Sequence, residues 1–385
     1  ARDVLVGDQV LRLDSTVYRN AINQMLAGGS LYDYQMVAFG QVLPFNYPPF
    51  AAIVLMPWAL LPVGWSQGLW MLVQIVAATI MVGLVLTRTA PRWLPSGWRF
   101  IGIMIVAVAA FLASAAAMQS LLLGQISLVV GALVVIDLLW IPARFRGYLT
   151  GIAGAIKLYP MIFLPYFLLS RQWRAAAGAG VGFVVSTGLA WAFLPQESLR
   201  YWTVELFATG RVGGLDWLRN KSLLGLMAHF EVGGGFYRLW WAGVVLMLFG
   251  FAMWRAVRHR RRGESVAAML VVGTLAGLMS PISWPHHLVI VALVPIYLML
   301  LERKVWFIVG LAAVVVFNYY SPAVFPGDAT STWQELAQYL VTVVMVVIAV
   351  SGLPSRTPLA TTATDEIGSC GAHESNHSSG AGGAR

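Results

Sequence analysis

The sequence predicts an all-α polytopic membrane protein with about nine to ten transmembrane helices and one re-entrant hairpin. Of its 385 residues, 59% are hydrophobic and only 11% are charged, whereas soluble domains carry about 25% charged residues. Mean hydropathy is +0.74. Apolar runs long enough to cross a bilayer recur along the chain. No alternating pattern indicates a barrel, and helices are the default element at membrane depth.

Residues 1–46 are polar enough to lie outside the bilayer, and they contain one amphipathic helix. Its apolar residues recur at intervals of three and four, and Gly28 and Gly29 end it. Residues 47–62 are apolar but short and bracketed by prolines, so we expect an interfacial or re-entrant segment. The predicted spans are 66–87, 100–118, 120–140, 174–195, 238–257, 266–280, 286–301, 304–320 and 335–353.

Arginine and lysine in the short loops set the predicted orientation. The strongest cluster lies at residues 255–262, and basic residues also fill the loops near residues 88–99, 144–146 and 303–304. The positive-inside rule places these loops in the cytoplasm. Segment 1–46, loop 196–236, the SWPHH turn at 283–287 and loop 321–334 then share the non-cytoplasmic side of the plasma membrane. The same rule explains the net charge of +9, so the basic balance does not indicate a nucleic-acid partner.

Residues 147–169 interrupt simple alternation, because arginines flank the segment at both ends. A broken hairpin that enters and leaves on the cytoplasmic side satisfies both ends. Gly151, Gly154 and the Tyr159–Pro160 pair supply the break. Non-helical backbone at this depth must line a cavity enclosed by protein.

The chain is expected to form one catalytic transmembrane domain, residues 1–353, followed by a disordered cytoplasmic tail, residues 354–385. The tail holds the single cysteine, Cys370, so no intrachain disulfide can form. The first residue is Ala1 rather than Met, so we expect that a segment upstream is missing.

Asp14 opens the amphipathic helix. One interpretation makes it the N-cap, because Asp is a preferred cap. The other makes it a general base at the membrane surface. The two are compatible, because capping would fix the carboxylate and lower its pKa.

His286 and His287 begin a predicted span beside Trp284. They could be polar anchors, although Trp and Tyr are the usual anchors. A metal site is not expected, since no HxxxH or HxH pair lies beside them in the sequence. A hydrogen-bonding or acid–base role is more economical.

Further polar residues are candidates for binding a substrate. Lys157 within the hairpin either snorkels to the headgroups or binds a phosphate anion. Arg211 and Lys221 would add positive charge for a phosphate, although an outer loop can simply be solvated. Gln125 could face a cavity, and Tyr47 could pack or stack on a sugar. Asn220 and Trp284 complete the substrate-binding set.

Four stretches in this order resemble glycosyltransferase family 87: LDSTVYRNAINQMLAGGSLYD, FNYPPFAAIVLMPWALLP, IKLYPMIFLPYFLLSRQW and SPISWPHHLV. The resemblance implies a GT-C fold and a polyprenyl-phosphate-mannose donor. It also implies a glycolipid acceptor of the phosphatidylinositol mannoside or lipoarabinomannan type, an α-(1→2) product and a periplasmic active site without cofactor.

The resemblance also implies roles for residues. Asp14 matches the catalytic aspartate, His286 and His287 match the paired histidines, and Lys157 matches the basic position before Tyr-Pro. Two positions depart from the family pattern: Ser127 replaces an asparagine, and Lys221 replaces the glutamine of NQS.

Three other functions are alternatives. An arabinofuranosyltransferase of the same family would need motifs in the outer loops that we do not find. A lipid or sugar transporter would explain Lys157 and Gln125, but not the gathering of Asp14 and the histidine turn on one face. A structural membrane subunit would not need a buried lysine.

Overall fold

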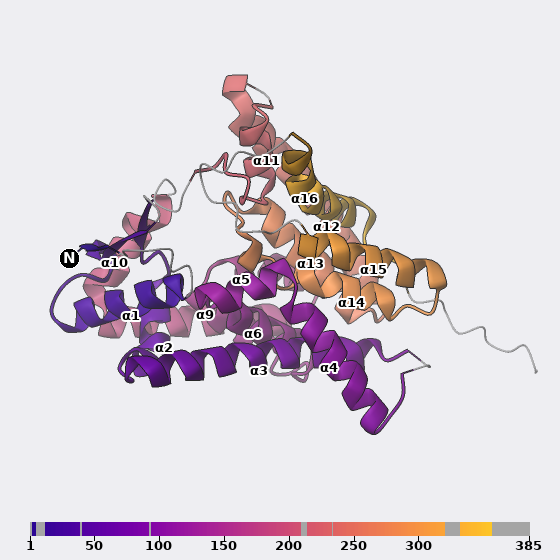
Figure 1. The fold of residues 1–385 in the computed structure, drawn as a ribbon, viewed down its shortest axis with the longest axis horizontal. Helices are drawn as coiled ribbons and strands as arrows, with labels where there is room; N and C mark the ends of the chain where they lie inside the picture. The colour runs from indigo at the N-terminus through magenta and orange to yellow at the C-terminus, as the bar shows by residue number, and fades with distance from the viewer. Residues whose placement is uncertain are drawn as a thin grey trace, which may run out of the picture. The chain divides into compact units, whose positions relative to one another are not determined.

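The computed structural model describes residues 2–4, 12–38, 41–91, 94–208, 214–232, 234–319 and 332–355. Arg211, most of the predicted outer loop 321–334 and nearly all of the predicted tail therefore lie outside the described residues. Figure 1 shows a fold built almost entirely of helices. The helices are α1 Leu13–Leu26, α2 Pro49–Ala59, α3 Val63–Thr89, α4 Trp98–Leu112, α5 Ala115–Leu123, α6 Ser127–Leu139, α7 Tyr148–Ile156, α8 Phe163–Leu169, α9 Trp173–Phe193, α10 Pro195–Thr203, α11 Leu223–His229, α12 Tyr237–Arg261, α13 Ser265–Met279, α14 Val294–Met299, α15 Lys304–Tyr319 and α16 Thr332–Ser351.

Several helices have the length and composition of membrane spans. Among the described residues, α3, α9 and α12 are each long and apolar enough to cross a bilayer, and α4 with α5 makes a fourth candidate that is bent by 72°. Helices α6, α13, α15 and α16 are apolar but shorter. The chain is thus a helical multi-pass membrane protein, and the count of nine to ten spans stays a prediction.

Three predicted spans are divided differently in the structure. The bend between α4 and α5 falls at Ser114, whose hydroxyl caps α5 by accepting a hydrogen bond from the Ala117 amide, and α5 ends at Gly124. Predicted spans 100–118 and 120–140 thus become three helices. The predicted span 286–301 is wrong as a single helix. Pro285 begins a 3-10 turn, η6 Pro285–His287, and Pro295 lies at the start of the short α14, with a second turn, η7 Val291–Leu293, between them.

The all-α prediction misses a small sheet at the N-terminal side. Strand β2, Gln35–Ala38, pairs parallel with β1, Arg2–Val4, and antiparallel with β3, Gln41–Pro44. In β2, Met36 and Ala38 are buried while Gln35 and Val37 are half-buried. This two-residue period is typical of a strand with one packed face, but four residues are too few to stand out in the sequence.

Segment 147–169 is broken, as predicted. α7 ends before Lys157, whose backbone is extended (φ −151°, ψ 122°), and the chain continues through η2, Tyr159–Ile162, into α8. Arg146, which precedes α7, donates a hydrogen bond of 3.2 Å to the side chain of Gln172, which follows α8. The two ends of the segment therefore lie together, which is the geometry of a hairpin.

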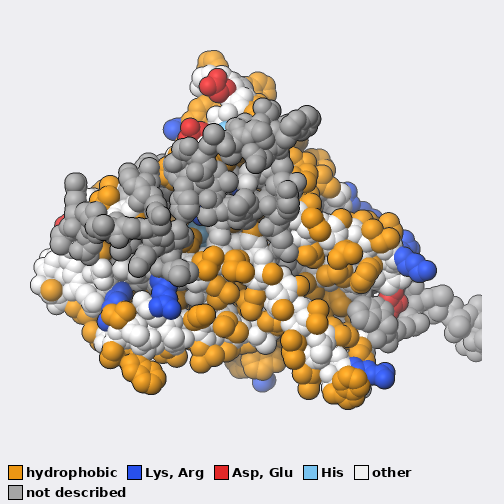
Figure 2. Space-filling view, in the orientation of Figure 1, with side chains coloured by type: hydrophobic (Ala, Val, Ile, Leu, Met, Phe, Trp, Pro, Cys, Tyr) orange, Lys and Arg blue, Asp and Glu red, His pale blue; other side chains and the backbone are white. Residues whose placement is uncertain are grey.

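Helix α13 lies at the centre of the described residues. It packs on α12 and α16, and almost every one of its side chains is buried. By contrast, α3, α4, α9, α12 and α15 expose many large hydrophobic side chains. Figure 2 shows hydrophobic side chains spread over much of this face of the molecule. Such a surface is expected where helices meet lipid.

Candidate active site

Asp14 lies in the first turn of α1 but is not its cap. The N-cap is Arg12, in the left-handed conformation with φ 67°. The carboxylate of Asp14 instead accepts a hydrogen bond of 2.7 Å from the side-chain amide of Gln125. The capping prediction is therefore wrong, and the carboxylate is held by the loop between α5 and α6.

Gly124 lets α1 approach that loop closely. It ends α5 with φ +70°, and a Cβ at this position would clash with the Ser15 hydroxyl. The backbone amide of Arg12 donates to the carbonyl of Leu122 at 2.6 Å, and Trp70 donates to the carbonyl of Gly124 at 2.8 Å. These contacts fix the start of α1 on the loop and so place Asp14 against Gln125.

A buried hydrogen-bond network extends from Gln125 into the protein. Its side-chain oxygen accepts from the hydroxyls of Tyr18 (2.9 Å) and Tyr47 (2.8 Å). Lys157 donates to the hydroxyl of Tyr47 at 3.4 Å and to that of Ser127 at 3.1 Å. Gln125 and Tyr47 thus support Asp14 and Lys157. Ser127, which replaces the asparagine of the family pattern, thus still provides a hydrogen-bonding side chain at this position.

The histidine turn is held by the loop before α11. The side chain of Asn220 accepts from the amides of Ser222 (3.1 Å) and Ser283 (2.9 Å), and it donates to the carbonyl of Pro281 at 3.2 Å. The hydroxyl of Ser222 also donates to Pro281 at 2.9 Å. The amide oxygen of Asn220 accepts two hydrogen bonds and its nitrogen donates two, all within the protein, so in this structure Asn220 fixes the turn and its predicted substrate contact is not supported.

Lys221 is also a framework residue. Its ammonium donates to the carbonyls of Leu218 (2.7 Å) and Gln338 (3.0 Å) and to the side chain of Gln338 (2.6 Å). An ammonium has three donors, and all three are used. Burial, together with the charge of Arg219, lowers the pKa of Lys221 to about 7. The predicted phosphate contact is therefore not supported.

Five ionisable side chains lie close enough for their charges to interact: the predicted Asp14, Lys157, His286 and His287, and Arg219. Asp14 interacts with the charges of Lys157 and Arg219, and Lys157 also acts on His286 and His287. The two imidazole rings lie edge to face, 4.7 Å apart, and α5 packs on their turn. Within the described residues, Nδ1 of His286 is buried without a hydrogen-bond partner.

The pKa of Asp14 departs from the sequence prediction. Burial raises this pKa from 3.8 to about 6, while the Gln125 hydrogen bond and the positive charges of Lys157 and Arg219 oppose the rise. Capping was expected to lower it. A carboxylate with a pKa near 6 is ionised at neutral pH and is a stronger base than an exposed one.

The structure adds two residues that sequence reasoning missed. Tyr18 is one of the regularly spaced apolar residues of the predicted amphipathic helix, yet its hydroxyl bonds Tyr47 and Gln125, each at 2.9 Å. Arg219 lies in the predicted outer loop 196–236, yet its charge interacts with Asp14.

The predicted substrate-binding residue Trp284 packs on Trp217, with ring centroids 5.8 Å apart, and part of its surface is exposed.

Comparison with known proteins gives a consistent result. The sequence model of glycosyltransferase family 87 matches residues 45–281. The chain is 31% identical to the polyprenol-phosphate-mannose-dependent alpha-(1-2)-phosphatidylinositol mannoside mannosyltransferase of Mycobacterium tuberculosis, over 91% of this chain and 86% of that protein. It is 30% identical to the Mycolicibacterium smegmatis protein of the same name, over 86% and 81%. A M. smegmatis pentamannoside mannosyltransferase is 31% identical over 75% and 69%. The chain belongs to glycosyltransferase family 87.

Proposed function

We propose that this protein transfers mannose from polyprenol-phosphate-mannose to a hydroxyl group of a phosphatidylinositol mannoside, with Asp14 as general base. The observation that carries this proposal is the grouping of one held carboxylate with Lys157, Arg219 and the two histidines. The names of the similar mycobacterial enzymes support mannose as the sugar. They favour it over arabinose, and the family favours an enzyme over a transporter.

The arrangement suits a direct displacement. The acceptor oxygen bonds to the anomeric carbon of mannose, the bond from that carbon to the phosphate oxygen breaks, and the acceptor proton passes to Asp14. A β-linked donor then gives an α-(1→2)-linked product by inversion. A general base must reach the hydroxyl at about 2.6–3.2 Å. The half-buried position of Asp14 leaves room for such an approach.

The cations have a separate role in this proposal. Lys157 and Arg219 stabilise the charge on the departing polyprenyl phosphate, since guanidinium and ammonium groups are the usual phosphate ligands. His286 offers its buried Nδ1 to the sugar or phosphate, and His287 and Trp284 border the same site. We place this site on the non-cytoplasmic side of the plasma membrane.

Transfer of labelled mannose from polyprenol-phosphate-mannose tests the proposal. Asp14→Asn keeps the shape of the side chain and removes its basicity, so turnover should fall by about 10²–10⁴-fold. Asp33→Asn is the matched control. Its carboxylate is exposed and bonded to Arg200 at 2.6 Å, so turnover should be unchanged. A folded Asp14→Asn protein with normal mannose transfer would refute the base assignment.

A further inference from the structure

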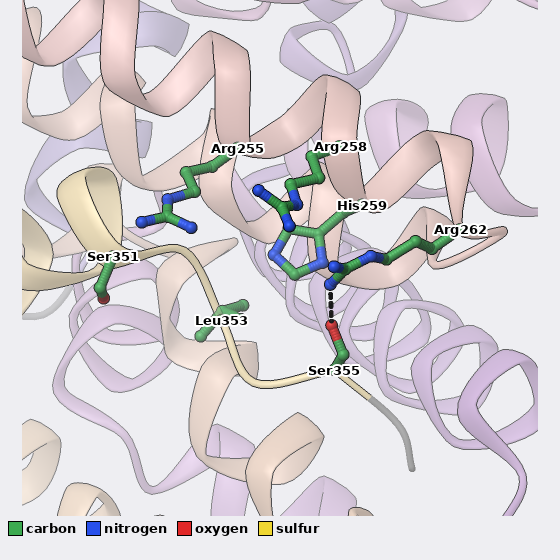
Figure 3. A pocket seen from close by; sticks show the side chains of 7 residues that line it. All are labelled: Arg255, Arg258, His259, Arg262, Ser351, Leu353 and Ser355. Carbon is green, nitrogen blue, oxygen red and sulfur yellow. Dashed lines mark hydrogen bonds between the residues drawn. The ribbon is translucent and has the colours of Figure 1, made fainter. Parts of the chain in front are cut away.

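A second polar site lies where α12 ends and α13 begins. A partly open cavity of about 130 Å³ lies there between the last two turns of α12 and the end of α16 with the segment that follows it. Figure 3 shows its lining: Arg255, Arg258, His259, Arg262, Ser351, Leu353 and Ser355. Three of these seven residues are arginines, and none takes part in the mechanism proposed above.

Two of the three arginines are held in place by hydrogen bonds within the protein. Arg255 donates from Nε to the carbonyl of Val350 at 3.0 Å, and Arg262 donates to the hydroxyl of Ser355 at 2.9 Å. Figure 3 shows the guanidinium groups of Arg255 and Arg258 directed toward the space between α12 and residues 351–355. Fixed guanidinium groups are pre-organised for binding a planar or tetrahedral anion.

The acidic residue near the cavity, Glu264, is already hydrogen-bonded within the protein. The carboxylate of Glu264 bonds His259 at 2.7 Å and accepts from Ser355 at 3.1 Å. It therefore helps to hold the lining in place. Arginines at a helix C-terminus are favoured by the helix dipole and by the positive-inside rule. Those effects do not require three of them to line one cavity.

The backbone over the cavity is shaped to lie close to α12. Gly352 has φ +74°, which other residues rarely adopt. A Cβ at Gly352 would lie 3.1 Å from Cδ of Arg255 and 3.1 Å from Nε2 of His259. The cavity is thus a built feature of the α12–α16 contact.

This cavity and the candidate active site lie at opposite ends of α13. The helix leaves the basic cluster at Ser265 and reaches the histidine turn after Met279, about 22 Å of helix later. Lys221 bonds the start of α16 through Gln338, whereas Arg255 bonds its end through Val350. The two sites are therefore separate.

We propose that the cavity binds the phosphate group of an anionic phospholipid headgroup. Arginine clusters recognise phosphate through charge-assisted, often bidentate, hydrogen bonds, and basic pockets between helices bind lipid headgroups. The surface beside the cavity favours a lipid over a soluble phosphate. Trp254, Phe251 and Val347 are exposed there. Arg255 and Arg258 both lie over the Trp254 ring, at 4.5 and 5.6 Å. The acyl chains would lie on this apolar surface.

The test uses the full chain in detergent micelles, titrated with phosphatidylglycerol and followed by native mass spectrometry. Arg258→Gln removes an exposed side chain and should not affect folding. Arg255→Gln removes the most firmly held arginine. Each should weaken phosphatidylglycerol binding about fivefold. Arg261→Gln is the matched control, because Arg261 is exposed on the same turn and does not line the cavity. The Arg261→Gln protein should bind phosphatidylglycerol as tightly as the unmodified protein.

The outcomes separate a site from general charge. Loss of binding in Arg258→Gln and Arg255→Gln but not in Arg261→Gln supports the proposal. Equal loss in all three, or in none, would overturn it. Phosphatidylcholine and soluble glycerol phosphate are titrated in the same way for comparison. If glycerol phosphate binds as tightly as phosphatidylglycerol, the site takes a soluble phosphate and the lipid assignment is wrong.

Discussion

The carboxyl group of Asp14 has a pKa of about 6 because burial outweighs the neighbouring positive charges. If Asp14 is the base, only its ionised form is active, so turnover should rise with pH and reach its midpoint near 6. A pH–rate profile of mannose transfer under kcat/KM conditions would measure this. A profile that is flat from pH 5 to 8 would argue for another base.

The same pKa predicts an unusual effect on stability. A carboxyl group whose folded pKa exceeds its unfolded value makes the fold less stable as pH rises between the two values. For Asp14 this window runs from 3.8 to about 6. Asp14→Asn should therefore leave the free energy of unfolding at neutral pH equal or higher, while activity falls. Denaturant unfolding of both proteins in detergent would check it, and a large loss of stability in the variant would contradict it.

Lys157 is the other residue whose role can be tested in isolation. Lys157→Met keeps the apolar stem and removes the ammonium, which donates only to Tyr47 and Ser127 among the described residues. If the ammonium binds the donor phosphate, KM for the donor should rise and kcat should fall, with the acceptor KM less affected. The buried ammonium bonds these two hydroxyls inside the protein and does not snorkel to the headgroups, so unchanged donor kinetics would leave it a structural role in this network.

At the scale of elements, the site depends on two anchored turns. One is the Gly124–Gln125 loop under α1, and the other is the histidine turn under the Asn220–Ser222 segment. Neither turn contains a long helix or a strand of its own. Their geometry is thus imposed by side chains that bond backbone groups from distant parts of the sequence.

Asn220→Ala should show this dependence. It leaves the buried amides of Ser222 and Ser283 without their acceptor, which typically costs about 1–3 kcal/mol. Mannose transfer should fall because the histidine turn loses its support. Asn23→Ala, at an exposed position in α1, is the control and should change neither unfolding nor transfer. Loss of transfer without loss of stability would instead indicate that Asn220 contacts a substrate.

At the scale of the whole molecule, orientation remains a prediction from the positive-inside rule. Replacing Cys370, the single cysteine, by serine gives a background for labelling. Val232→Cys and Arg261→Cys are both at exposed positions. In intact cells, a membrane-impermeant maleimide should react with the first and should reach the second only after permeabilisation. The reverse pattern would invert the orientation and move the candidate site to the cytoplasm.

The sequence could predict the helical membrane fold because apolar length is a local signal. It could single out Lys157 and the histidines because polar residues stand out in apolar surroundings, and Asp14 because it opens the amphipathic helix. It could not predict that Asn220 and Lys221 serve the framework. Their partners lie about 60 and 117 positions away, in residues 281–283 and 338. The split of 286–301 was also missed, since its composition matches that of a span.

The orientation of the Gln125 amide restricts where a proton can travel. Its nitrogen faces Asp14 and its oxygen faces Tyr18 and Tyr47, and an amide neither gains nor loses a proton near neutral pH. The hydroxyl groups that lead to Lys157 can therefore polarise the Asp14 carboxylate through Gln125. They cannot pass a proton to it, because the amide lies between them. If Asp14 is the base, a proton taken from the acceptor leaves from the carboxylate oxygen that Gln125 does not bond, toward water and not into the hydrophobic interior of the bilayer.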